Sequence, residues 1–380
     1  MGTIVPEMGT SRSNRRDWRS RPCSLVKKTR IPLFASHADY NVYLVAVTVA
    51  SPAFPTLPGI RAARHRLGDR VETTSVRRLR DHALDPRLPT GSALWLKEEL
   101  FQRTGSFKPR GALTVMMSLT PEQLARGVTG VSAGNHAISL AYSARELGST
   151  ATVVMPRTAN PYRIAMCTEL RAEVVLVETV HEAFETARAI ERDEGRTFVH
   201  PYEGPLTALG TATVGLEFIE QTRANGVELD AVVVAAGGGG LTGGVACAVK
   251  LLAPAAQLFV VEPEGADTMH RSFAAGTPQA IDKVRTIADS LGAPRCEPYS
   301  FALNQAYVDD VVLVSDDAIR DAMRLLYRSA KLVTEPAGAA SLAAVVGPLR
   351  DRLAGQQVGV VVCGGNVDAA SFCRYLALDE

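Results

Sequence analysis

The sequence predicts an α/β protein whose sheets consist mainly of parallel strands. Short apolar runs rich in β-branched residues alternate with longer segments of helical periodicity along most of the chain, and this alternation is typical of parallel sheets covered by helices. The run Ala231-Val-Val-Val-Ala-Ala236 is apolar throughout, which indicates a strand buried on both faces. With 380 residues, 46% of them hydrophobic, the chain can form one large domain or two ordinary ones.

The individual elements follow from these patterns. Strands are predicted at residues 93–97, 150–155, 173–177, 231–236, 257–261, 311–314 and 357–363. Helices are expected between them, among others at residues 135–147, 181–193, 315–329 and 336–348. Residues 1–56 are predicted to be an irregular, basic N-terminal extension, and prolines at 52, 55 and 58 mark its end. It is interpreted either as a disordered or loosely attached segment or as an upstream start that the functional protein does not need.

Charge and cysteine content exclude several classes of function. The net charge is +1, which gives no electrostatic reason to expect nucleic acid as a partner. The apolar run at residues 42–50 is too short to span a bilayer, which needs about 20 residues. The six cysteines show no C-x-x-C spacing, so we expect reduced thiols in a cytoplasmic protein. A small molecule is the expected partner.

Lys108 lies in the segment Thr104-Gly-Ser-Phe-Lys-Pro-Arg-Gly-Ala112, at the start of an expected helix. Pro109 suits the first helical turn, Ser106 can cap the helix, and Gly111 permits close packing. The positive field at a helix start and partial burial both favour the neutral amine that a Schiff base requires. Taken alone, a solvated surface lysine explains the segment as well.

A second segment, Val131-Ser-Ala-Gly-Asn-His136, joins a strand end to the helix predicted at 135–147. Amides at a helix N-terminus favour anions, and Ser132 adds a hydroxyl donor, so a substrate carboxylate is the natural ligand. The same residues permit another interpretation, in which Ser132 or Asn135 only caps the helix.

The third segment, Gly237-Gly-Gly-Gly-Leu-Thr-Gly-Gly244, follows the buried strand at 231–236. Four successive glycines let backbone amides approach a phosphate closely. Gly238, Gly240 and Gly243 also fit the dinucleotide fingerprint G-x-G-x-x-G, and Glu262 supplies the acid about 20 residues further on. By this motif alone, an NAD-dependent oxidoreductase is an equal interpretation.

The fourth segment, Val361-Val-Cys-Gly-Gly-Asn366, also follows a strand. Cys363 is expected in the crevice where parallel strands end, or else as a buried thiol beside a tight turn. A dinucleotide enzyme explains the glycine loop only. A pyridoxal 5'-phosphate (PLP) site explains all four segments, as an amine for the aldehyde, an anion site for the substrate, a phosphate cup and a partner for the pyridine nitrogen.

These segments resemble the fold-type II PLP enzymes, specifically the threonine/serine dehydratase family with its serine racemase-like relatives. The resemblance is collinear over residues 57–378 and rests on residues 106–112, 132–136, 237–241, 335–339 and 363–366. It implies a two-domain fold like that of tryptophan synthase β. Residues 126–205 would form a small inserted α/β domain, and residues 57–125 plus 206–380 would form the large PLP-binding domain.

The resemblance also implies roles for individual residues. Lys108 would form the Schiff base and, with Ser132, be catalytic. The implied cofactor-binding residues are Phe107, Lys108, Asn135, Gly237, Gly238, Gly239, Gly240, Leu241 and Cys363. The implied substrate-binding residues are Ser132, Ala133, Gly134, Asn135 and His136.

The activity implied is β-elimination from a β-hydroxy amino acid, with L-threonine or L-serine ranked first, to give a 2-oxo acid and ammonia. Racemases of this family have a second serine where Ala133 stands, and alanine cannot donate a proton, so we rank lyase ahead of serine racemase. Ser290 and the segment Gly210-Thr-Ala-Thr213 depart from the family pattern. These departures keep bulkier substrates open, such as 3-phenylserine or 3-hydroxyaspartate.

A cation site is left uncommitted, and no metal ligand is assigned. Glu262 and Ala266 match family positions for a divalent or monovalent cation, whereas Thr268 stands where serine racemase has a second carboxylate, and hard cations prefer anionic oxygen ligands. A homo-oligomer, dimer or tetramer, is expected. Two rival classes are the NAD-dependent oxidoreductase and a non-enzymatic relative that binds PLP or amino acids.

Overall fold

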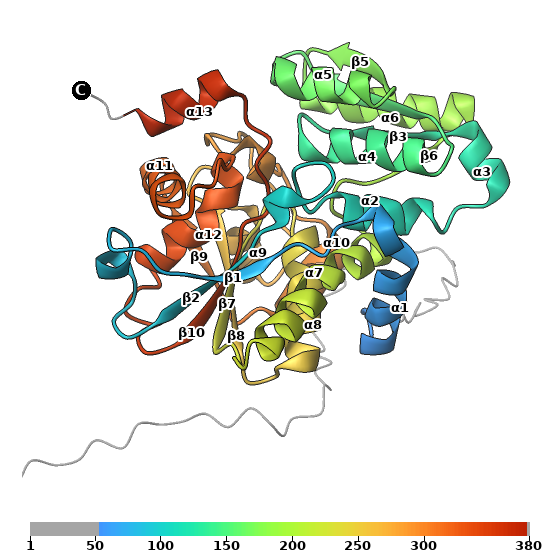
Figure 1. Ribbon diagram of the computed structural model, residues 1–380. Helices are drawn as coiled ribbons and strands as arrows, with labels where there is room; N and C mark the ends of the chain where they lie inside the picture. Colours follow the sequence, from blue (N-terminus) through green and yellow to red (C-terminus); the bar gives the residue numbers. More distant parts are fainter. Residues whose placement is uncertain (1–52, 378–380) are drawn as a thin grey trace, which may run out of the picture. The chain divides into compact units, whose positions relative to one another are not determined.

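Two sheets organise the part of the chain that the structure, a computed structural model, describes, residues 53–377 (Figure 1). The larger has six strands in the order β1-β2-β10-β7-β8-β9, with bounds β1 Val76–Leu79, β2 Ala93–Lys97, β7 Ala231–Ala235, β8 Gln257–Pro263, β9 Asp310–Val314 and β10 Gln357–Val361. Only β1 runs antiparallel to its neighbour; the other pairs are parallel. β7 is buried along its whole length, as its apolar sequence predicts.

The smaller sheet has four parallel strands in the order β5-β4-β3-β6, with bounds β3 Val128–Val131, β4 Ala151–Pro156, β5 Glu173–Val177 and β6 Thr197–Phe198. Alternate residues of β4 enter different apolar clusters. Val153 packs with the cluster of α4 (Asn135–Glu146), and Val154 packs with that of α6 (Val180–Glu194). Because successive strand residues point to opposite faces, the two helices cover opposite faces of this sheet.

Of the remaining helices, α5 packs against α4 and β5 of the smaller sheet, whereas α7, α8, α9 and α12 contact strands of the larger sheet. Helices α7 and α8 pack against each other, and α12 contacts β7, β8, β9 and β10. The bounds of these helices are α1 Leu57–Leu67, α2 Pro109–Met116, α3 Pro121–Arg126, α5 Pro161–Glu169, α7 Pro205–Ala224, α8 Gly240–Leu252, α9 Thr268–Ala275, α10 Pro298–Tyr307, α11 Asp316–Leu325, α12 Pro336–Val346 and α13 Ala369–Leu376. Short 3₁₀ turns occupy Gly68–Arg70, Asp85–Arg87, Glu99–Phe101 and Asp289–Leu291.

The predicted α/β fold with mostly parallel strands is confirmed, and so are all seven predicted strands, with ends that move by one or two residues. The predicted helix 315–329 changes character, because α11 ends at Leu325 and a π-helical turn follows at Leu326–Ala330. No described helix is long and apolar enough to cross a membrane.

The predicted N-terminal extension lies outside the described residues except for residues 53–56. Of those four residues, Phe54 and Pro55 are partly buried. The ring of Phe54 contacts those of Tyr299 and Tyr307, and Thr56 caps α1. The described structure therefore includes the last four residues of the predicted extension.

Candidate active site

Lys108 is the N-cap residue of α2, and Pro109 is the first residue of that helix, as predicted. The segment before it is tied to the end of β10, because Ser106 pairs with Gly364 in an antiparallel bridge. The prediction that Ser106 caps the helix is wrong. Its hydroxyl is buried and makes no hydrogen bond within the described part of the chain, since the chain turns into α2 only after Lys108.

The amine of Lys108 is held in place and is easily deprotonated. Its Nζ donates a hydrogen bond to the carbonyl oxygen of Pro201 at 2.6 Å. Burial lowers the pKa of Lys108 to about 8, although Cys363 and Glu335 oppose the shift. At neutral pH this amine is therefore neutral far more often than an ordinary lysine, as a nucleophile for an aldehyde must be.

Lys108 and the other predicted site segments line one cleft. Its walls comprise Phe107, Lys108, Val131, Ser132, Ala133, Gly134, Asn135, His136, Pro156, Arg163, Val180, Phe184, Pro201, Tyr202, Ala235, Ala236, Gly237, Gly238, Gly239, Gly240, Leu241, Asp289, Ser290, Leu291, Gly292, Ala293, Pro294, Glu335, Ala337 and Cys363. Every residue to which the sequence assigns a role is among them. The structure thus brings together four segments that are far apart in the chain.

The glycine loop connects β7 to α8 at one side of this cleft. Gly239 has a φ of 86°, which favours glycine, and it is the N-cap of α8. No described side chain caps this helix, so the amides at its start are free to bind an anion. A Cβ on Gly238 would lie 2.2 Å from the ring of Tyr202. These observations fit a phosphate group held by backbone amides, as the predicted cup requires.

The Ser132 loop follows β3 and leads into α4. The Ser132 hydroxyl accepts a hydrogen bond from the amide of Gly134 at 3.0 Å. The N-cap residue of α4 is Gly134, which has no side chain to cap the helix. The alternative in which Ser132 or Asn135 only caps the helix is therefore wrong, and the loop faces the cleft.

His136 lines the cleft, but its imidazole is already hydrogen-bonded to the backbone. Its Nε2 donates to the carbonyl of Val199 at 2.9 Å, and burial lowers its pKa to about 3. His200, beside Lys108, accepts through Nδ1 from the amides of Tyr202 and Glu203, and burial lowers its pKa to about 4. Both imidazoles are neutral at physiological pH and add no positive charge to the cleft.

Asn135 belongs to a closed set of four hydrogen-bonded residues that we call the polar ring: Asn135, Arg163, Glu335 and Asn366. Arg163 donates to Glu335 at 2.9 Å and to the Asn366 carbonyl at 3.1 Å. The Asn135 amide donates to Glu335 at 2.6 Å and accepts from Asn366 at 2.8 Å. All four side chains are buried. The sequence assigned a role only to Asn135.

Cys363 lies two residues beyond β10 and is buried in the cleft wall. Its Sγ donates to the carbonyl of Ala337 at 3.4 Å. Burial raises the pKa of the thiol, so it stays protonated. A neutral, weakly bonding group therefore stands where the resemblance places the partner of the pyridine nitrogen.

Glu262 is not part of this cleft. Its carboxylate oxygens accept from the amides of Met269 and His270, at 2.9 and 2.7 Å, where α9 begins. Burial raises its pKa to about 8. Among residues 53–377, no group of three or more His, Cys, Asp or Glu side chains could hold a metal ion.

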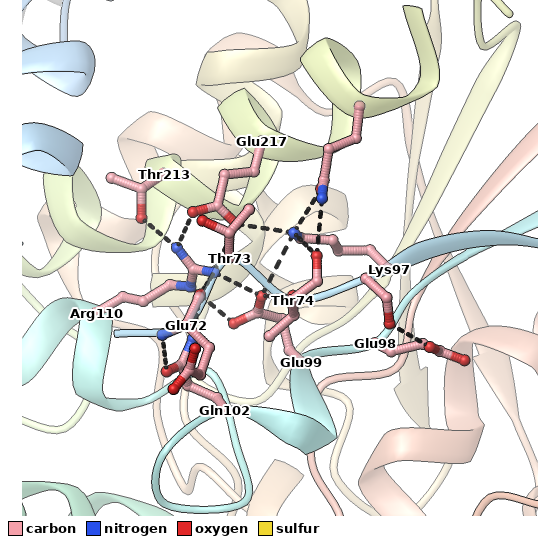
Figure 2. Close-up of polar contacts among 12 residues, drawn as sticks. Glu72, Thr73, Thr74, Lys97, Glu98, Glu99, Gln102, Arg110, Thr213 and Glu217 are labelled. Atoms are coloured by element: carbon pink, nitrogen blue, oxygen red, sulfur yellow. Dashed lines mark hydrogen bonds and ion pairs between the residues drawn. The ribbon is translucent and has the colours of Figure 1, made fainter. Parts of the chain in front are cut away.

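A buried ion cluster lies behind the Lys108 segment (Figure 2). Arg110, on α2, donates two hydrogen bonds to each of Glu99 and Glu217, at distances of 2.8 or 2.9 Å. Lys97 on β2 lies 2.8 Å from Glu217. Because Arg110 follows Lys108 by two residues, these contacts fix the start of α2 against β2 and α7.

Comparison with known proteins identifies the family. The family described as pyridoxal-phosphate dependent enzyme matches residues 73–364. The chain belongs to this family. It is 52% identical to phenylserine dehydratase from Ralstonia pickettii, over 85% of this chain and 97% of that protein, and 38% identical to an L-threonine ammonia-lyase from Thermotoga maritima, over 76% and 70%. The structure of maize serine racemase is similar to this one with a TM-score of 0.79 at 33% identity, covering 85% of this chain and 97% of that one.

As a member of the PLP-dependent family, the protein is an enzyme of the ammonia-lyase and dehydratase type, and the predicted fold, cofactor and enzyme class are confirmed. The NAD-dependent interpretation of the glycine loop is wrong. The acid it required, Glu262, is held by the α9 amides away from the cleft.

Several residues of the cleft and of the polar ring received no role from the sequence, for different reasons. Glu335 and Asn366 lay in segments that carried the resemblance but received no role. Phe184 lay within the helix predicted at 181–193 and Val180 just before it, and neither was assigned a role. Arg163 gave no signal at all, because its partners lie 126 to 203 residues away in the sequence.

Proposed function

We propose that the protein catalyses β-elimination from 3-phenylserine, or a closely similar aryl β-hydroxy amino acid, to give a 2-oxo acid and ammonia. The observation that carries this proposal is the apolar wall of the cleft. Val180, Phe184 and Leu291 line the same cleft as the Lys108 amine. Such a wall stabilises a bound aromatic side chain, because apolar area is buried and the rings make contact. The 52% identity to a phenylserine dehydratase supports the same substrate.

The charges of the cleft argue against a dicarboxylate such as 3-hydroxyaspartate. Within the described cleft lining, the basic side chains other than histidine are Lys108 and Arg163. Arg163 already pairs with Asp289 at 2.6 Å and Glu335 at 2.9 Å. A second substrate carboxylate would meet paired charges and neutral imidazoles, so it would be desolvated without compensation.

L-threonine and L-serine, which the sequence ranks first, fit the same chemistry. Their side chains are small, however, and would leave the wall formed by Val180 and Phe184 uncovered. We therefore place the aryl substrate ahead of them. All these substrates undergo the same reaction. The α-proton and the β-hydroxyl are lost first, and hydrolysis then releases the amino group as ammonia and leaves a 2-oxo acid.

In the proposed mechanism Lys108 would hold PLP through its amine, and its Nζ would take the α-proton of the substrate. When bound, PLP supplies an electrophilic carbon and an electron-withdrawing ring. The Ser132 loop would bind the substrate carboxylate, as a serine hydroxyl and free amides suit an anion. Ala133 has no proton to donate from the opposite face, which favours elimination over racemisation.

The cofactor would be held by the residues that the resemblance implies. The amides of residues 237–241 would bind the phosphate, Phe107 would flank the ring, and Asn135 would contact the ring hydroxyl. Cys363 would leave the pyridine nitrogen unprotonated, because a neutral thiol does not stabilise the protonated ring as a carboxylate would.

We also propose the division of the chain into a large domain, residues 57–125 plus 206–380, and a small one, residues 126–205. The separate four-stranded sheet, all of whose strands lie within residues 128–198, supports this division. A homo-oligomer, dimer or tetramer, and a cytoplasmic location are part of the same proposal. Free thiols at Cys167, Cys247, Cys296, Cys363 and Cys373 support a reducing compartment.

The test is a substrate screen combined with one substitution in the wall. Purified enzyme is assayed for 2-oxo acid release from L-threo-3-phenylserine, L-threonine, L-serine and 3-hydroxyaspartate. We expect phenylserine to have the highest kcat/KM. Phe184→Ala should lower kcat/KM for phenylserine about tenfold, the equivalent of about 1.4 kcal/mol of lost contact, and lower that for threonine by less than about threefold.

Phe101→Ala is the matched control, because Phe101 is exposed and lies outside the cleft. It should leave all four values unchanged. A higher kcat/KM for threonine than for phenylserine, or an equal loss for both in Phe184→Ala, would show that the wall does not select an aryl group.

A further inference from the structure

The polar ring joins the two sheets through every one of its bonds. Asn135 and Arg163 belong to helices of the four-stranded sheet, α4 and α5, whereas Glu335 and Asn366 belong to the part of the chain around the six-stranded sheet. Each of the four hydrogen bonds runs from one part to the other. The ring therefore fixes the two sides of the cleft relative to each other at Asn135.

The ring also determines which way the Asn135 amide points. Asn366 donates through Nδ2 to the carbonyl oxygen of Thr104 at 2.7 Å, which only accepts, so the orientation of its amide is fixed. The same Nδ2 donates to Oδ1 of Asn135. Nδ2 of Asn135 therefore faces Glu335, and it also donates, at 3.4 Å, to the hydroxyl of Ser290, which lines the cleft.

We propose that Arg163 is a positioning residue for the cofactor. By holding the Glu335 carboxylate as an acceptor, it keeps the amide of Asn135 oriented with an N–H toward the ring hydroxyl of PLP. This inference rests on PLP binding at Lys108, but it does not depend on which hydroxy amino acid is the substrate.

The charge of Arg163 is needed because Glu335 is fully buried. Burial raises the pKa of Glu335, and Arg163 opposes that shift. The other charged or titratable groups that act on Glu335 are Asp289, Lys108 and the neutral thiol of Cys363. Without Arg163, Glu335 would lose the cation that favours its charged form, and a protonated Glu335 would present an O–H donor to the Asn135 amide. The Asn135 amide would then lose its acceptor at Glu335, and its orientation would depend on Asn366 alone.

The experiment compares PLP-loaded wild type with Arg163→Met, Arg163→Lys and the control Arg157→Met. Arg157 lies shortly before α5, the helix that carries Arg163. It is exposed, pairs with Glu178 and does not line the cleft. The readouts are the visible absorption spectrum of the bound cofactor between about pH 6 and 9, its dissociation constant, and kcat and KM for phenylserine and threonine.

For Arg163→Met we expect a changed ratio of the visible to the near-ultraviolet band and about tenfold weaker PLP binding. We expect kcat to fall by about tenfold or more on both substrates, with their kcat/KM ratio constant to within about twofold, since the change acts through the cofactor. Arg163→Lys keeps the charge but not the fork of donors, and should lie between the two. Arg157→Met should match wild type.

A wild-type spectrum and wild-type kcat per bound cofactor in Arg163→Met would overturn the proposal, even if its melting temperature falls, because that result assigns Arg163 a structural role only. If Arg163→Met does not fold, Arg163→Lys decides by the same spectrum. A changed substrate ratio would place Arg163 in substrate recognition instead, which also overturns it. The spectral result stands whether or not phenylserine is the substrate, and Lys108→Ala, which loses the visible band altogether, confirms that the band reports PLP at this site.

Discussion

Replacement of Arg110 by methionine tests whether the buried ion cluster stabilises the fold around Lys108. Arg110 and Glu99 are both fully buried, and Arg110 satisfies both oxygens of Glu99 at 2.8 Å. Without Arg110, Glu99 keeps only the hydroxyl of Thr74 and the amine of Lys97, which is 3.9 Å away, among its described side-chain partners. Glu217, by contrast, keeps Lys97 and Arg64 as partners.

The expected cost therefore arises mainly at Glu99. Removing one partner of a buried ion pair leaves an uncompensated charge and costs about 3–5 kcal/mol. For a chain of this size the melting temperature should fall by roughly 4–7 °C. Arg110→Lys keeps the charge but cannot donate to both carboxylates as a fork, so its loss should be smaller but still measurable.

The free energy of unfolding is measured by urea denaturation of the PLP-loaded enzyme, followed by far-ultraviolet circular dichroism. Arg61→Met is the control, because Arg61 and Glu220 form an ion pair on the surface, with side chains 57% and 49% exposed. Such a pair contributes about 1 kcal/mol at most. If Arg110→Met loses no more than Arg61→Met, the cluster does not stabilise the fold and the reasoning from burial is wrong.

Two further predictions concern the cleft. The rate at which PLP forms a visible band with cofactor-free protein should rise with pH around a midpoint near 8. Burial lowers the pKa of Lys108 to about 8, and only the neutral amine reacts. A rate that still rises steeply above about pH 10, where an ordinary lysine titrates, would contradict that pKa. Cys363→Asp should increase transamination relative to elimination, because a carboxylate beside the pyridine nitrogen favours protonation of that nitrogen, whereas the buried thiol stays neutral. The ratio of the two products is measured by chromatography. An unchanged ratio would show that Cys363 does not control the protonation of the pyridine nitrogen.

The strands could be predicted because their signal is local. A strand such as β7, Ala231–Ala235, is apolar at every position, and that pattern is visible without knowledge of its neighbours. β1 was missed because its sequence, Val-Arg-Arg-Leu, carries two charges and is stabilised by pairing with β2. β6 has only two residues and exists through its pairing with β3. Both depend on partners that a local pattern does not reveal.

The same distinction explains the site. Lys108, the Ser132 loop and the glycine loop each lie where a strand ends or a helix begins, and taken together these segments indicate a PLP site. Arg163 is different, because in the sequence it is one arginine on a short helix. Its function depends on Glu335, 172 residues away, and on Asn366, 203 residues away. Only the fold brings a buried carboxylate next to it, and a buried carboxylate needs a cation. Residues that act on the cofactor through another residue are thus the ones that sequence motifs omit, and Arg163 is the residue in this cleft for which that argument can be tested most directly.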